Sequence, residues 1–301
     1  MPLWIPLTIA AAFLQNMRST LQKQLTGELS AIAATYVRFA FGLPIAVVYL
    51  WSLVAITGHE LPAPNWTFLF YCIVGGLGQI WGTALLVGLF AYRNFAVGTT
   101  YSKTETVQAA LFGVIVLGDR PSLGATAAIL VSLAGVIAIS MAKSHLTLAN
   151  FLRTLSDRAT LMGIGSGAGF GIAAVAYRAA SLSLGRSDFL IPAGFTLVTV
   201  LVIQTIVMTI WLGWREPAQL AGTMRNWKVS SGVGIAGSLA SIGWFTAMTI
   251  ENAAYVRALG QIELVFTFAS SHFLFREKTA RLELAGIALV IGGLLLLLFL
   301  R

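Results

Sequence analysis

Charged residues are scarce in this sequence. Only 10% of its 301 residues are Asp, Glu, Lys or Arg, whereas about 25% of the residues in an ordinary soluble domain are charged. A soluble protein must cover its surface with polar groups, and a chain that is 57% hydrophobic has too few of them. The single cysteine, Cys72, cannot form an internal disulfide. The composition therefore excludes a soluble globular enzyme, a disordered chain and a disulfide scaffold, and it indicates a protein of the lipid bilayer.

Sequence patterns for catalysis or metal binding are absent as well. The three histidines, His59, His145 and His272, are far apart and fall in expected loops or at the ends of apolar runs. Neither the H-E-x-x-H zinc motif nor the G-x-S-x-G motif of serine hydrolases occurs, and the sequence has no phosphate-binding loop for ATP. We therefore expect no catalytic residues, no metal site and no cofactor, and we predict that the protein is not an enzyme.

The basic excess, a formal net charge of +8, falls mainly in short segments between the apolar runs. Membrane proteins carry Lys and Arg there, and these residues set the orientation of the chain. The sequence has no basic block with interleaved aromatic residues of the kind that holds a nucleic-acid strand. We expect the lipid bilayer as a partner and no nucleic acid.

Ten segments are long and apolar enough to cross a bilayer, because a spanning helix needs about 20 mostly apolar residues. Lipid offers no hydrogen bonds to backbone groups, so runs of this length are expected to form helices. The sequence predicts an all-α integral membrane protein with ten transmembrane helices. The expected spans are residues 3–22, 31–57, 66–92, 96–117, 122–142, 159–184, 187–213, 229–250, 253–275 and 281–300.

The two halves of the chain repeat each other. Aligning the intramembrane residues Glu105 and Glu263 brings further residues into register. The matches are Asn94 with Asn252, Ala96 with Ala254, and Asp119-Arg120 with Glu277-Lys278. We predict two five-helix repeats, residues 1–145 and 155–301. Since five is an odd number, the second repeat enters the membrane in the opposite orientation, as in the inverted repeats of many secondary transporters.

Both repeats contain short segments that carry a further pattern. They are Gln15-Asn16-Met17-Arg18 through Lys23, Thr35-Tyr36-Val37-Arg38-Phe39 and Asn94–Arg120 in the first repeat, and Asn252–Lys278 with the glycine-rich last span in the second. This pattern resembles the EamA-type repeats of the drug/metabolite transporter superfamily. The resemblance implies a transporter that moves small metabolites, amino-acid-like compounds or drugs, more often outward.

Several ionisable side chains lie inside the expected spans, where a charge at the bilayer centre costs about 2.5–3.5 kcal/mol on insertion scales. The clearest are Arg38, Lys103, Glu105 and Glu263. One interpretation is a structural network in which Glu105 pairs with Arg38 or Lys103 and locks helices together. The other is a polar cavity that holds a substrate or a proton, in which some basic groups remain available for a ligand.

Helical spacing places Tyr101, Glu105 and Gln108 on one face of the span 96–117, since they are three and four residues apart. Lys103 lies nearly opposite Glu105 and is expected to reach another helix. Two other spans carry stripes of small residues that let helix backbones approach each other. These stripes are Gly75, Gly78 and Gly82, and Gly234, Gly237 and Ser241.

We predict a substrate site around the intramembrane charges. The candidate binding residues are Arg38, Gln79, Trp81, Tyr101, Lys103, Glu105, Tyr177, Trp244, Gln261 and Glu263. Arg38 and Lys103 would hold a carboxylate or phosphate group, and Glu105 would bind an amine or a proton. Glu105 and its counterpart Glu263 are the expected coupling residues, because intramembrane carboxylates serve as proton carriers in transporters.

The sequence as a whole predicts a secondary active transporter that works by alternating access and is driven by a gradient or by exchange, with export as the expected direction. Its expected partners are a small-molecule substrate with an anionic group, protons and the bilayer; monomer and homodimer both stay open. We expect a multi-pass protein of the bacterial inner membrane. Loop charges favour both termini outside, whereas the resemblance favours both inside. The alternative interpretation is a membrane-embedded enzyme or a channel-like facilitator using the same polar cavity.

Overall fold

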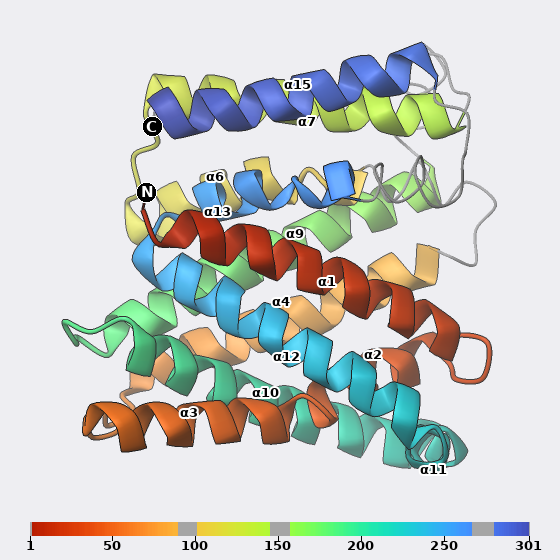
Figure 1. Ribbon diagram of the computed structural model, residues 1–301. Coiled ribbons are helices and arrows are strands. Elements are labelled where there is room, and N and C mark those ends of the chain that lie inside the picture. The colour runs from red at the N-terminus through yellow and green to blue at the C-terminus, as the bar shows by residue number, and fades with distance from the viewer. Residues whose placement is uncertain (1, 90–100, 145–156, 267–279, 301) are drawn as a thin grey trace. The chain divides into compact units, whose positions relative to one another are not determined.

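The structure is a computed structural model that describes residues 2–89, 101–144, 157–266 and 280–300 (Figure 1). Within these ranges the regular structure is helical throughout, without strands. The helices are α1 (Trp4–Leu25), α2 (Ala31–Ala40), α3 (Leu43–Thr57), α4 (Trp66–Gly88), α6 (Glu105–Leu117), α7 (Leu123–Ser144), α9 (Arg158–Ser183), α10 (Leu190–Arg215), α11 (Pro217–Arg225), α12 (Trp227–Ile250), α13 (Ala253–Gly260) and α15 (Arg281–Leu300).

Seven helical segments of the described residues are long and apolar enough to cross a membrane, and α2 and α3 together count as one of them. They correspond to seven of the ten expected spans. Of the others, the segment 3–22 forms helix α1, which also carries polar side chains, and the segments 96–117 and 253–275 lie partly outside the described residues. The prediction of an all-helical membrane protein is confirmed, and the number of ten spans stays a prediction.

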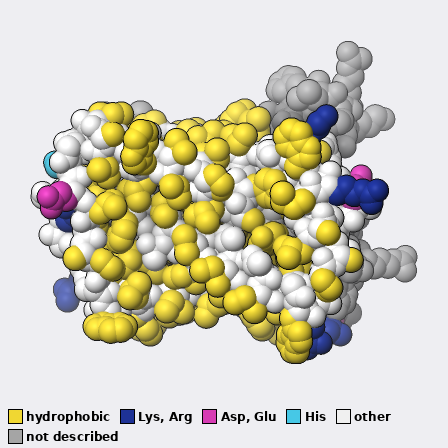
Figure 2. All heavy atoms as spheres, turned by 90° about the horizontal axis from the view of Figure 1, so that it is seen from below, with side chains coloured by type: hydrophobic (Ala, Val, Ile, Leu, Met, Phe, Trp, Pro, Cys, Tyr) yellow, Lys and Arg dark blue, Asp and Glu magenta, His cyan; other side chains and the backbone are white. Residues whose placement is uncertain are grey.

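The outer surface has the character of a membrane protein. On α3 and α10, large apolar side chains such as Trp51, Ile210 and Trp214 are 70%, 68% and 75% exposed. Figure 2 shows one face on which hydrophobic side chains cover the middle, while charged side chains gather at the two ends. Such a band has the arrangement needed to meet the hydrocarbon core of a bilayer and leave the charges in water.

The chain forms two compact units. Unit 1 contains Met1–Ile80 and Ala173–Asn252, and unit 2 contains Trp81–Ile172 and Ala253–Arg301. Each unit therefore takes segments from both of the expected repeats. Helices α4 and α9 each contribute residues to both units.

In unit 1, helix α1 packs along α12, and α10 packs against α2, α3 and α12 (Figure 1). A small residue permits the closest approach, since a Cβ atom at Gly243 of α12 would lie 2.9 Å from the Cβ of Ala11 in α1. Stacked aromatic rings fill the interior. The ring centroids of Phe68 and Phe195 are 5.2 Å apart, and those of Tyr177 and Phe245 are 4.4 Å apart.

In unit 2, helices α7 and α15 lie side by side and touch through glycine (Figure 1). A Cβ atom at Gly135 would lie 2.6 Å from the carbonyl oxygen of Gly286, and a Cβ atom at Gly293 would lie 2.7 Å from the backbone nitrogen of Ser132. The two backbones are thus in direct contact, as in small-xxx-small helix pairs of membrane proteins.

The expected span 31–57 is broken at Phe41–Gly42, so the prediction of one uninterrupted helix is wrong here. Pro44 lies in the first turn of α3 and explains the break. Proline has no backbone N–H to bond the carbonyl group of Ala40 four residues earlier, and its ring clashes with that carbonyl.

The described part of the span 96–117 is also interrupted, at the turn Lys103–Thr104, after which Glu105 begins α6. The Thr104 hydroxyl donates a hydrogen bond to the carbonyl oxygen of Tyr101 at 2.6 Å and accepts one from the Gln108 side chain at 2.8 Å. Side-chain bonds of this kind compete with the helical backbone pattern. The assumption of one continuous helix through Tyr101, Glu105 and Gln108 is therefore wrong.

The span 253–275 is interrupted at Gln261–Ile262, directly after α13. Here the backbone nitrogens of Gln261 and Ile262 bond carbonyl groups three residues earlier, at 3.0 and 3.1 Å. This tighter winding is typical of the end of an α-helix. Membrane proteins tolerate broken helices where the exposed backbone groups are buried in protein or line a cavity.

The loop between α9 and α10 carries an ion pair in which the Nε atom of Arg186 lies 2.8 Å from the Oδ2 atom of Asp188. Burial alone would raise the pKa of Asp188, but the hydrogen bond from Arg186, a second bond from the Ile191 backbone and the charges of Arg186 and His59 together hold this pKa below its ordinary value. The Asp188 carboxylate also accepts a hydrogen bond from the first turn of α10 at 3.0 Å, and it thereby helps to fix where that helix begins.

Candidate functional site

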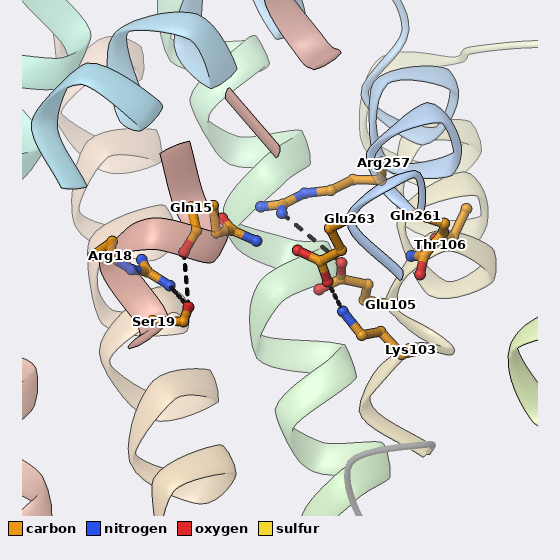
Figure 3. Close-up of polar contacts among 9 residues, drawn as sticks. All are labelled: Gln15, Arg18, Ser19, Lys103, Glu105, Thr106, Arg257, Gln261 and Glu263. Carbon is orange, nitrogen blue, oxygen red and sulfur yellow. Dashed lines mark hydrogen bonds and ion pairs between the residues drawn. The ribbon is translucent and has the colours of Figure 1, made fainter. Parts of the chain in front are cut away.

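Four ionisable side chains come together in unit 2 at the breaks in the helices. The Lys103 ammonium group donates a hydrogen bond to the Glu263 carboxylate (Figure 3). The Nη1 atom of Arg257 lies 3.8 Å from the Oε1 atom of Glu105. The side chains are between 9% and 24% exposed, so this group, the charge quartet, is largely withdrawn from the surface. Its net charge is zero.

The helix breaks place these charges at favourable helix ends. Glu105 is the first residue of α6, and Arg257 lies in the last turn of α13. The N-terminus of a helix carries a partial positive charge and the C-terminus a partial negative one, so both side chains are stabilised where they lie. Lys103 lies in the turn before α6 and is attracted by both carboxylates.

The two breaks occupy matching positions in the expected repeats. The alignment of Glu105 with Glu263 also aligns the turn Lys103–Thr104 with the turn Gln261–Ile262. Each ion pair joins one residue of the first repeat to one of the second. The match is not complete, because the second repeat has the uncharged Gln261 at the position that corresponds to Lys103. The Nε2 atom of Gln261 donates a hydrogen bond to Thr106 Oγ1 at 3.1 Å.

Helix α9 supports the quartet through two glycines. A Cβ atom at Gly167 would lie 3.0 Å from the carbonyl oxygen of Ser102 and 3.2 Å from the backbone nitrogen of Glu105. One turn further, a Cβ atom at Gly171 would lie 3.1 Å from the backbone nitrogen of Ala109. Glycine at these positions lets α9 lie directly against the first turn of α6, which fixes the position of the Glu105 backbone.

Unit 1 contains a separate cluster of uncharged polar side chains. The Tyr177 hydroxyl donates to the carbonyl oxygen of Gly75 at 3.0 Å and to Gln79 Oε1 at 3.1 Å. Gln204 Nε2 donates to the same Gln79 oxygen at 2.8 Å. Gln204 is fully buried and Tyr177 is 2% exposed. Interhelical bonds of this kind join α4, α9 and α10 inside the apolar unit.

The predicted site residues therefore fall into several places. Lys103, Glu105, Gln261 and Glu263 lie together in unit 2, and Gln79 and Tyr177 lie together in unit 1. Four predicted residues lie outside these two groups. Arg38 and Trp244 are buried in unit 1, at 8% and 6% exposure. Tyr101 is 7% exposed and packs on Ile137 and Met141, whereas Trp81 is 62% exposed at the surface.

Sequence reasoning missed Arg257, Thr106 and Gln204 as members of these clusters. Arg257 and Gln204 carry a usable signal, because a charged or amide side chain inside an apolar span is costly and usually has a specific partner. Thr106 carries none, since threonine is common in membrane helices. Another intramembrane arginine, Arg178, bonds the carbonyl oxygens of Met248 and Glu251 at the end of α12. No group of three or more His, Cys, Asp or Glu side chains suited to a metal ion occurs in the part of the chain that the structure describes.

Broken apolar helices that hold ion pairs away from the surface are characteristic of membrane transport proteins. The EamA-like transporter family matches the chain twice, over residues 2–141 and 158–299, and the chain belongs to this family. The members are transporters of the drug/metabolite transporter superfamily and not enzymes, so the chain is a multi-pass membrane transporter with a small-molecule substrate.

The fold is shared with a solved structure. A crystal structure, described only as that of a protein, superimposes with a TM-score of 0.74 and covers 99% of this chain and 96% of that chain at 14% sequence identity. At this identity the likeness concerns the fold alone. No curated protein matches the chain.

Proposed function

We propose that the protein is a secondary active transporter that carries small metabolites, amino-acid-like compounds or drugs by alternating access. The observation that carries this proposal is the charge quartet at the two matching helix breaks. In this account the chain has ten spans in two inverted five-helix repeats, residues 1–145 and 155–301, which expose a polar site to each side of the membrane in turn.

The free-energy cost of placing the charge quartet inside the membrane supports a functional role for it. Four separate charges inside a bilayer would cost about 10 kcal/mol or more on insertion scales, and pairing recovers only part of this cost. Buried ion pairs can often be replaced by well-packed apolar side chains with no loss of stability. A quartet that only joined α6 and α13 would therefore make the protein less stable than apolar side chains at the same positions. Binding a charged solute or coupling to protons, by contrast, requires charged side chains.

The two ion pairs suit different tasks. Glu263 is hydrogen-bonded to Lys103, whereas the 3.8 Å between Glu105 and Arg257 is longer than a hydrogen bond. Glu105 is therefore the carboxylate with room to accept a proton or a substrate amine, and Glu263 is its partner in coupling. Lys103 and Arg38 supply positive charge for a carboxylate or phosphate group of the substrate. The remaining candidate contacts are Gln79, Trp81, Tyr101, Tyr177, Trp244 and Gln261.

The energy source follows from the same sequence. The chain has no ATP-binding loop, so transport draws on a proton gradient or on solute exchange, with export as the expected direction. The expected location is the bacterial inner membrane. Loop charges favour both termini outside and family resemblance favours both inside, and a reporter fused after Arg301 distinguishes the two arrangements.

Reconstituted vesicles provide the test. A thermal-shift screen of metabolites on purified protein first identifies a ligand, because a ligand stabilises the folded state in proportion to its occupancy. Saturable counterflow of that ligand supports a carrier. Ohmic current would instead indicate a channel-like facilitator, and chemical turnover without vesicles would indicate an enzyme.

The role of Glu105 is tested by its amide variant. We expect Glu105→Gln to abolish the pH dependence of transport between about pH 5.5 and pH 8, because glutamine cannot exchange a proton. Glu28→Gln, which changes an exposed carboxylate in the turn after α1, is the matched control. Transport by Glu105→Gln at the wild-type rate across this range would show that protons are not coupled through Glu105.

A further inference from the structure

A short helix, α11, joins α10 to α12 at one end of unit 1. The chain leaves α10 at Glu216, whose backbone is not helical, and Pro217 begins α11. Proline has no backbone N–H to continue the hydrogen bonds of α10, so the chain turns here. Figure 1 shows α11 nearly end-on, whereas α10 and α12 run across the view. Since α10 and α12 are long and apolar enough to cross a membrane, a helix set across their ends lies along the membrane surface.

One face of α11 is fixed to the beginning of α2. A Cβ atom at Gly222 would lie 2.9 Å from the Cδ2 atom of Leu29. The Ser30 backbone nitrogen donates a hydrogen bond to Gln219 Oε1 at 2.8 Å, and the Ser30 hydroxyl donates one to the Glu216 carboxylate. These contacts determine which face of α11 points away from the rest of unit 1.

The outward face of α11 is apolar. Ala218, Ala221 and Met224 follow one another at helical spacing and are all exposed, Met224 to 65%. Exposed tryptophans stand just outside the two ends of the helix, Trp214 at 75% and Trp227 at 56%. A short helix with an outward apolar face, and with tryptophan beside each end, is typical of a segment that lies at the boundary between lipid and water.

Basic side chains lie at both ends of the same helix. Arg215 precedes it, Arg225 is its last residue, and Lys228 lies in the first turn of α12. All three are exposed, and none forms an ion pair within the part of the chain that the structure describes. The guanidinium carbon of Arg215 lies 4.5 Å from the centre of the Trp214 ring, a cation–π contact that holds this charge at the level of the indole.

The basic side chains outnumber the exposed acidic ones at this end of unit 1. In the described residues 26–30 and 213–228 the acidic residues are Glu28 and Glu216, and Ser30 already bonds the Glu216 carboxylate. The nine residues of α11 extend over about 14 Å, so the three positive charges lie along one narrow surface. This surface, the α11 strip, consists of Trp214, Arg215, Met224, Arg225, Trp227 and Lys228.

We infer that the α11 strip binds the headgroups of anionic phospholipids. Guanidinium and ammonium groups bind phosphate oxygens, and basic residues at a membrane surface attract anionic lipid. The apolar face of α11 contacts the upper part of the acyl chains, which keeps the basic groups at the level of the lipid phosphates. The inference does not depend on the transported solute, so it extends beyond the proposed function.

The test places the full chain in phosphatidylcholine vesicles that contain a small fraction of lipid with bromine atoms high in its acyl chains. Bromine quenches the fluorescence of nearby tryptophan, so Trp214 and Trp227 report on the α11 strip. Brominated phosphatidylglycerol is compared with brominated phosphatidylcholine at the same fraction. We expect the anionic lipid to quench more strongly, and we expect this excess quenching to shrink as sodium chloride is added, because salt screens exposed charges.

Single variants show whether the basic groups of the α11 strip cause the excess. Arg215→Gln, Arg225→Gln and Lys228→Gln are each expected to lower the relative binding constant of the anionic lipid about fivefold, the effect of one basic residue at a membrane surface. Arg225→Lys keeps the charge and is expected to retain the binding. Arg120→Gln, which removes an exposed arginine between α6 and α7, is the matched control and leaves the constant unchanged.

Three results would overturn the inference. The first is equal quenching of the wild-type protein by the two brominated lipids, a comparison that requires no variant to fold. The second is an excess that persists when Trp214→Phe and Trp227→Phe are combined, since the anionic lipid would then bind elsewhere. The third is loss of the excess when inorganic phosphate replaces chloride at constant ionic strength, which would assign the basic groups to a free anion. An excess that survives phosphate supports the lipid headgroup.

Discussion

Neighbouring glycines in α15 provide a sharp test of how unit 2 is held together. A Cβ atom at Gly293 would lie 2.7 Å from the Ser132 backbone nitrogen and 2.9 Å from the carbonyl oxygen of Ala128, both in α7. A Cβ atom at Gly292 would have no neighbour within 4 Å. The substitutions Gly293→Ala and Gly292→Ala add the same methyl group at adjacent positions of the same helix. The two variants therefore differ only in the atoms that this methyl group contacts.

The magnitude follows from these distances. Ordinary contact begins at 3.4 Å, so the methyl group of Gly293→Ala arrives about 0.7 Å too close to a backbone that cannot rotate away. Overpacking of this kind costs about 1–3 kcal/mol. Replacing glycine by alanine in a helix recovers about 1 kcal/mol of propensity. We therefore expect Gly293→Ala to be destabilised by about 1 kcal/mol and Gly292→Ala to be stabilised by about 0.5–1 kcal/mol.

Thermal unfolding of the purified protein in one detergent, followed by tryptophan fluorescence at one scan rate, measures the difference. A gap of about 2 kcal/mol corresponds to roughly 4–8 °C between the two variants in a protein of this size. Equal melting temperatures, or a lower one for Gly292→Ala, would refute direct contact of α7 and α15 at Gly293.

Three further changes test other parts of the structure. Asp188→Asn is expected to lower stability by about 0.5 kcal/mol at neutral pH. Because the pKa of folded Asp188 is depressed, its stabilising effect is present above the ordinary carboxyl pKa and is lost as the pH falls through the folded value, so melting curves of variant and wild type should converge in acid. Tyr177→Phe removes the donor to Gly75 and is expected to cost about 1 kcal/mol, measured by the same unfolding assay. Gly167→Ala is expected to slow counterflow several-fold by displacing the start of α6, whereas Gly213→Ala, with no atom within 4 Å, should leave it unchanged.

The membrane class and most helices could be predicted from the sequence because hydropathy acts locally. The run that forms α10, Leu190–Arg215, is apolar over most of its length, and the expected span 187–213 differs from it by a few residues. Hydropathy also identifies the charged candidates Lys103, Glu105 and Glu263. A charged side chain inside an apolar run has a high free-energy cost in the membrane, so its presence indicates a specific role.

The partners of those charges could not be predicted, because they depend on which helices become neighbours. Helical spacing indicated that Lys103 reaches another helix, and it pairs with Glu263. The structural interpretation expects Glu105 to pair with Arg38 or Lys103, yet the ion pair forms with Arg257. This residue comes close because two helices break at matching positions. The break before Glu105 depends on hydrogen bonds of the Thr104 side chain, which hydropathy does not register.

The central claim is that the charge quartet is the functional centre of a transporter. Exchanging the charges of the pair Lys103–Glu263 tests this claim most directly. Lys103→Glu and Glu263→Lys each place two like charges side by side, and each is expected to reduce counterflow about 100-fold or more, since breaking a buried pair costs about 3–5 kcal/mol. The double variant restores an ion pair with reversed polarity, so it is expected to regain thermal stability but not counterflow, because Lys103 and Glu263 have different roles at their own positions. Wild-type counterflow in the folded single variants, or a double variant that regains counterflow, would contradict the account.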